Sequence, residues 1–90
     1  EQKRAEAEAR SARSAPLRAA KARVTQLEKE IASLEEQQNS LTNALEAPET
    51  YNEPGKAVGL NRELATVVAR LETATSEWEK ASLEVSEMEG

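Results

Sequence analysis

The sequence predicts an all-α fold, an antiparallel two-helix coiled-coil hairpin with an N-terminal basic helical arm. Two series of mainly apolar residues repeat at alternating intervals of three and four, which is the spacing of a coiled-coil seam. A short stretch holding two of the three prolines separates the series, so the chain can fold back there. Only 2% of the 90 residues are aromatic, which favours a thin seam over a broad globular core.

The first long helix is predicted over residues 16–46. Its seam occupies the a and d positions of successive heptads: Leu17, Ala20, Val24, Leu27, Ile31, Leu34, Gln38, Leu41 and Leu45. Pro16 suits the first turn of a helix because it has no N–H to leave unpaired, and Ser14 is a candidate cap. Gln38 is the polar member of the series, and we interpret it as a register pin or an imperfect layer rather than a ligand contact.

The tip loop is predicted over residues 47–55 and the second helix over 56–88. The second seam contains Ala57, Leu60, Leu64, Val67, Leu71, Ala74, Trp78, Ala81, Val85 and Met88. The position of Trp78 favours a seam residue over an exposed partner anchor. Gly59 is expected to let the loop backbone approach the second helix closely.

Tyr51 is the large side chain of the predicted tip. We expect its ring to pack over the end of the seam against Leu45 and Leu60, with its hydroxyl in water. The alternative is that Tyr51 contacts a partner such as ribosomal RNA or protein.

The register of the hairpin is predicted from the charges beside the seam. If Leu34 lies opposite Leu64, Trp78 lies opposite the small Ala20. Attractive pairs then form at the g positions, Arg23 with Glu77 and Glu30 with Arg70. Sliding the helices by one heptad places Glu30 against Glu77, which disfavours that register, although each exposed pair contributes only about 0–1 kcal/mol.

Residues 1–15, called the arm below, alternate Ala with Lys, Arg and Glu and contain no large apolar side chain. Because Pro16 disfavours helical geometry at the residue before it, the arm is either a separate helix or a kinked extension. Residues 1–25 contain seven basic and three acidic side chains (+4), and residues 26–90 contain five basic and fourteen acidic (−9), which sum to the net charge of −5.

The basic side chains of residues 1–25 predict contact with the phosphates of a nucleic acid, without base reading, since no aromatic residue lies among them. These candidates are Lys3, Arg4, Arg10, Arg13, Arg18, Lys21 and Arg23. The alternatives are a solvated helical linker whose basic residues pair with Glu1, Glu6 and Glu8, and a protein partner.

The residue inventory excludes several functions for this chain. It has no Cys and no His, so thiol nucleophiles, disulfides, thiolate zinc sites and imidazole bases are absent. Its glycines do not form a phosphate-binding loop, and its carboxylates have no spacing that predicts a metal site or an acid–base pair. No apolar run reaches the roughly 20 residues of a membrane span, and no signal peptide begins the chain. We therefore expect a cytoplasmic, non-enzymatic fragment of a longer protein.

The order of features resembles a known family. The basic arm leads into Pro16-Leu17-Arg18 and Leu27-Glu28-Lys29-Glu30-Ile31, followed by the tip Pro48-Glu49-Thr50-Tyr51 and by Glu77-Trp78-Glu79. This succession resembles the C-terminal coiled-coil domain of the ABC-F proteins, soluble tandem ATP-binding cassette ATPases. The resemblance implies a C-terminal appendage of an ATPase that acts on ribosomes, with ATP and Mg²⁺ bound by the ATPase domains of the same chain and no cofactor here. In some relatives this domain is reported to bind DNA or other nucleic acid, often with a basic hairpin, whereas the hairpin here is acidic.

Two other functions remain open from the sequence. The tip Tyr51-Asn52-Glu53-Pro54 and the seam after it look similar to the helical hairpin of a peptide-chain release factor, and the arm of valyl-tRNA synthetase is a related possibility. A purely structural coiled coil, acting as a spacer or pairing between chains, is the other. We expect the two seams to pair within one chain, so that the fragment is monomeric.

Overall fold

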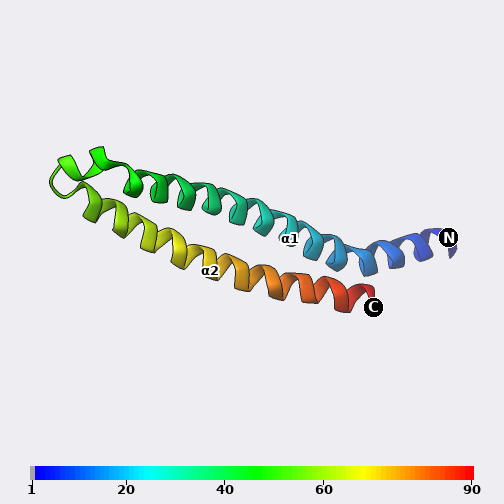
Figure 1. Cartoon of the computed structure of the whole chain (residues 1–90). Helices are drawn as coiled ribbons and strands as arrows, with labels where there is room; N and C mark the ends of the chain where they lie inside the picture. Colours follow the sequence, from blue (N-terminus) through cyan, green and yellow to red (C-terminus); the bar gives the residue numbers. More distant parts are fainter. Residues whose placement is uncertain (1) are drawn as a thin grey trace.

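Two long helices run antiparallel and side by side along most of the chain (Figure 1). The structure is a computed structural model that describes residues 2–90, including the side chains of residues 3–9 and 14–90. Helix α1 spans Gln2–Glu46, the 3-10 helix η1 spans Pro48–Asn52, and helix α2 spans Lys56–Glu89. The molecule is a thin rod of 75 × 20 × 14 Å. The prediction of an all-α helical hairpin is confirmed.

Helix α1 includes both the arm and the first helical segment of the hairpin. It begins at Gln2 and continues through Pro16, so the helix starts before residue 16 and the arm is an extension of it, one of the two predicted alternatives, and not a separate helix. The flanking Ala, Arg and Glu residues are strong helix formers, and Pro16 is exposed, where water can pair with the carbonyl that loses its helical donor. The axis of α1 changes direction in its N-terminal third (Figure 1), as expected of a helix that contains proline.

The end of α1 is closed by side chains of η1. The Thr50 hydroxyl donates to the carbonyl oxygen of Ala44, and the Tyr51 hydroxyl donates to that of Leu45. These carbonyls belong to the last turn, where helical donors have run out. Thr50 is 3% exposed and Tyr51 is 62% exposed. The Tyr51 hydroxyl was expected in water; it lies on an exposed part of the surface and also bonds to the backbone, a contact that the sequence analysis did not predict.

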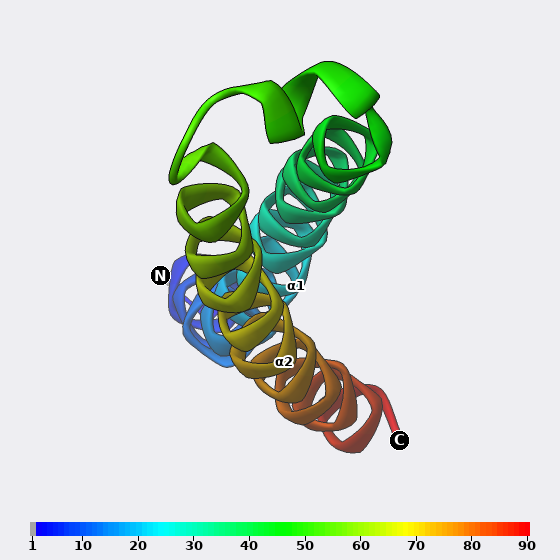
Figure 2. The same ribbon diagram turned by 60° about the vertical axis from the view of Figure 1, so that its left-hand side comes forward.

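The start of α2 depends on one glycine and not on the other. Gly55 has φ of +80°, a left-handed conformation that side chains other than glycine rarely adopt. Figure 2 shows η1 crossing between the helix ends before this turn. A Cβ on Gly59 would meet no atom within 4 Å, so the expected close approach of the backbone at this position is wrong.

Both predicted seams lie between the helices. The residues at d positions are buried over the middle of the hairpin, namely Ala20, Leu27, Leu34, Val67, Ala74 and Ala81. Those at a positions are half-buried, and Leu27 is the largest fully buried side chain, at 0% exposure. Met88, at the open end, is 48% exposed.

The helices pair one heptad away from the predicted register. Leu34 forms one buried cluster with Val67 and Ala74, and Leu71 packs against that cluster. Leu34 therefore lies opposite Leu71 rather than Leu64, since Leu71 stands between the other two in sequence.

A heptad shift keeps every a and d residue in the seam, so neighbouring registers differ only in their flanks and ends. The observed register brings Leu45 opposite Leu60, a layer that the predicted register leaves unpaired at the tip. It also places the large Trp78 opposite Leu27 instead of Ala20. The predicted pair of Arg23 with Glu77 nevertheless forms, at 2.8 Å, because these long side chains span the offset. Burial of apolar surface outweighs exposed charge pairs in setting the register.

Candidate functional site

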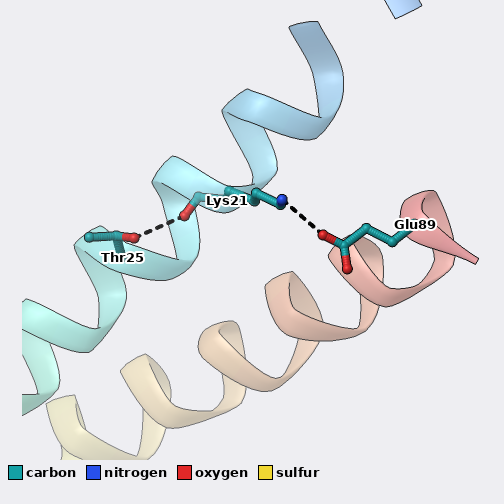
Figure 3. Close-up of polar contacts among 3 residues, drawn as sticks. All are labelled: Lys21, Thr25 and Glu89. Atoms are coloured by element: carbon teal, nitrogen blue, oxygen red, sulfur yellow. Dashed lines mark hydrogen bonds and ion pairs between the residues drawn. The ribbon is translucent and has the colours of Figure 1, made fainter. Parts of the chain in front are cut away.

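The arm projects beyond the end of α2. The Lys21 ammonium lies 2.9 Å from a carboxylate oxygen of Glu89, the last residue of α2 (Figure 3). The earlier part of α1 therefore extends past the hairpin as a single helix, as Figure 1 shows at the N-terminus. In the observed register about 14 residues extend in this way, or about 20 Å at the rise of an α-helix.

The described basic side chains of the arm are open to solvent. Lys3 is exposed, and the side chain of Arg4 is 85% exposed. Arg4 Nε lies 3.8 Å from a carboxylate oxygen of Glu8, one turn later on the same helix. Such an exposed pair contributes about 0.3–0.5 kcal/mol. The side chains of Arg10 and Arg13 lie outside the described residues.

The other three basic candidates are held by the protein itself. Arg18 Nη1 donates to the hydroxyl of Ser14 at 2.6 Å. Lys21 and Arg23 bridge to α2 through the ion pairs with Glu89 and Glu77. The side chains of Lys21 and Arg23 are 55% and 49% exposed, so they hold the open end of the hairpin together while part of each remains in solvent.

The side chain of Lys21 projects from a helical turn of α1. The Thr25 hydroxyl donates to the carbonyl oxygen of Lys21 at 3.2 Å, one turn back along the helix (Figure 3). The Lys21 side chain extends from this turn toward the C-terminal turn of α2. Among the candidates with described side chains, Lys3 and Arg4 are exposed on the arm, Arg18 bonds within α1, and Lys21 and Arg23 bridge to α2.

The tip presents a second exposed surface. Tyr51 is 62% exposed and Val58, in the first turn of α2, is 55% exposed. The Tyr51 hydroxyl donates to the backbone at the end of α1, which favours one orientation of the ring. Whether Tyr51 contacts a partner stays a prediction. Sequence reasoning missed the hydrogen bonds of the Thr50 and Tyr51 hydroxyls. Two hydroxyl side chains soon after a helix end could have indicated them, since the last carbonyls of a helix lack helical donors.

The hairpin offers no enclosed site among its described residues. The hollows along it are open grooves between the helices, one of them lined by Glu30, Arg70 and Glu77. No group of three or more carboxylates in the described part lies close enough to hold a metal ion. Neither helix, over the residues described, has an apolar stretch long enough to cross a membrane. Trp78 lies in the seam with its Nε1 buried and without a hydrogen-bond partner in residues 2–90.

These features define a rod-shaped helical hairpin domain with an N-terminal helical extension. Residues 16–82, which are 67 of the 90, match the model of the ABC transporter C-terminal domain family. The chain belongs to this family, which confirms the resemblance drawn from its motifs. Neither the comparison with curated proteins nor the comparison with solved structures returned a match. The match begins at Pro16 and so leaves out the arm.

Proposed function

We propose that this chain is the non-catalytic C-terminal interaction domain of an ABC-F ATPase and that its arm contacts the phosphates of ribosomal RNA or DNA. The membership in an ABC protein family supports the first part. In that setting ATP and Mg²⁺ belong to the ATPase domains of the same chain, in the cytoplasm, and the fragment itself is monomeric.

The observation that carries the second part is the separation of charge in space. The basic residues of the arm lie on a helix that extends beyond the acidic hairpin, with Lys3 and Arg4 exposed. A phosphate backbone can therefore approach the arm while the acidic body stays away from it. Lys and Arg neutralise phosphates one by one and release counterions, without selecting a sequence.

The ion pair of Arg4 competes only weakly with a phosphate. Within residues 2–15 the interaction of Arg4 is a long, exposed pair within its own helix. The arm extends past the end of α2, so binding would restrict a helix that lies outside the hairpin, and part of the binding free energy is offset by that restriction. We expect weak, strongly salt-dependent affinity.

The test measures fluorescence anisotropy of labelled RNA and DNA oligonucleotides at low and near-physiological salt. Lys3, Arg4, Arg10 and Arg13 are replaced together by Gln. The matched control replaces four basic residues of the hairpin body by Gln, at Lys29, Lys56, Arg62 and Lys80, with the same change in net charge. The arm variant should weaken binding and reduce the slope of log K against log salt by up to about 3, at roughly 0.7–0.9 per lost contact.

Equal losses in the two variants would show that only net charge matters and would refute the assignment of the arm. No binding at low salt would instead favour the second candidate, a spacer that faces protein partners. The family match favours both of these functions over the release-factor and valyl-tRNA synthetase alternatives.

A further inference from the structure

The two sides of the seam are covered to different extents. On an α-helix the e position lies beside a, and the g position lies beside d. Over the middle of the hairpin the d residues are buried and the a residues are half-buried, so the apolar seam is more exposed on the side of the e positions. We call this side the open face and the side of the g positions the closed face.

The flanking side chains explain this difference. On the closed face the g positions of α2 hold the long residues Glu63, Arg70 and Glu77, which line two hollows of mixed acidic and basic character. On the open face the e positions of α2 hold Val68, Thr75 and Ser82, which are too short to cover the a residues. The seam therefore forms the floor of a groove there.

The groove of the open face extends over much of the hairpin. Three hollows follow one another along it, from Val24 and Val85 near the open end, past Ile31 and Trp78, to Leu71 in the middle of α2. The second and third hollows share Ile31 and Thr75. Between Val24 and Gln38 the groove spans about 21 Å, or four turns of helix.

The rim of the groove is acidic. Glu28 and Glu35 of α1 and Glu72 and Glu79 of α2 line the two inner hollows, and no lysine or arginine lines them among the described residues. The Lys21 side chain stands only at the outer hollow, where it is paired with Glu89. An apolar floor between two rows of carboxylates is complementary to a helix with one apolar stripe and basic flanks.

We propose that the open face binds one basic amphipathic α-helix, of about 14 residues, from a partner protein, and that the two form a local three-helix bundle. Apolar side chains of that helix cover Ile31, Leu71 and Trp78, and its lysines or arginines pair with the glutamates of the rim. A second copy of this chain does not fit, since the same face on each copy would bring glutamates against glutamates. This surface lies along the hairpin, away from the arm.

Trp78 reports on this surface directly because it is the one tryptophan of the chain. The probe is a synthetic 21-residue helical peptide with Leu at a and d, Lys at e and g, and no aromatic residue; its matched partner has Glu in place of Lys. With the Lys peptide we expect a saturable blue shift of Trp78 emission and weaker quenching by acrylamide. The Glu peptide should cause neither change.

Two substitutions in the same helix localise the site. Thr75→Arg places a long cation across the groove, whereas Thr73→Arg places the same side chain on the closed face, and both threonines are exposed. Thr75→Arg should weaken binding of the Lys peptide at least about tenfold, equivalent to about 1.4 kcal/mol. Thr73→Arg should leave the affinity within about twofold. Circular dichroism checks that both variants keep the hairpin.

Three outcomes would overturn the proposal. They are no response of Trp78 to the Lys peptide, equal losses in the two arginine variants, and equal binding of the Lys and Glu peptides. Sedimentation provides a fourth, because a dimer of the chain that Thr75→Arg abolishes would identify the occupant as a second copy.

Discussion

Two glycines four residues apart should respond in opposite directions when replaced by alanine. Gly59 lies inside α2 with open space around its missing Cβ, so Gly59→Ala adds helix propensity and disturbs nothing. We expect a gain of about 0.5–1 kcal/mol in the free energy of unfolding. Gly55 has φ of +80°, where alanine costs about 1–2 kcal/mol. Alanine also restricts the unfolded chain, which returns about 0.4–1 kcal/mol, so Gly55→Ala should lose about 0.5–1 kcal/mol.

The two variants should therefore differ by about 1–2 kcal/mol. Thermal unfolding followed by far-UV circular dichroism resolves this difference, since about 1 kcal/mol shifts the Tm of a domain this size by about 4–8 °C. The melts are run at several protein concentrations, because an intramolecular hairpin has a Tm independent of concentration. Destabilisation by Gly59→Ala would show that the backbone at this position is in close contact. Stabilisation by Gly55→Ala would show that the turn does not need the left-handed conformation.

Three further predictions concern packing, the tip and the arm. Leu27→Ala should lower the free energy of unfolding in urea by about 2–4 kcal/mol because Leu27 is fully buried. Leu83→Ala should change it by less than about 0.5 kcal/mol because Leu83 is 60% exposed. Similar losses in the two variants would contradict the observed seam. Thr50→Val and Tyr51→Phe each remove a hydroxyl that donates to a carbonyl in the last turn of α1. Each should lower the free energy of unfolding by about 0.5–1.5 kcal/mol, with the lower value for the exposed Tyr51. An unchanged Tm would mean that water replaces these hydroxyls without loss. Amide hydrogen exchange should be much faster in residues 2–15 than in residues 24–45, since the arm extends past the end of α2. Equal protection would show that the arm is held by another contact.

The alternation of three and four residues predicted the fold and the seam, because that spacing leaves one narrow stripe to bury. The two prolines of the tip located the reversal, and the tip bounds of 47–55 agree with the helix ends at Glu46 and Lys56. The difference between a and d burial was also available in principle, from the short Thr75 and Ser82 on one side and the long Arg70 and Glu77 on the other.

The register was beyond prediction from charge. Arg23 reaches Glu77 in the observed register as in the predicted one, so this ion pair does not discriminate between them. What distinguishes the registers is the number of filled layers near the tip, which depends on how many residues the turn uses. That number depends in turn on η1 and on Gly55, whose local geometry a heptad pattern does not contain.

The continuity of α1 through Pro16 has a mechanical consequence. The arm and one side of the hairpin belong to the same helix. A partner that binds the arm would therefore also determine the orientation of the whole hairpin. The molecule is 75 Å long, so a rotation of roughly 15° at the gripped end, the size seen in subunit rotations, would carry the tip through about 20 Å. Helix α1 lacks one backbone hydrogen bond at Pro16, so it should bend most easily there. A residue that restores this hydrogen bond would transmit the rotation more completely to Tyr51 at the far end.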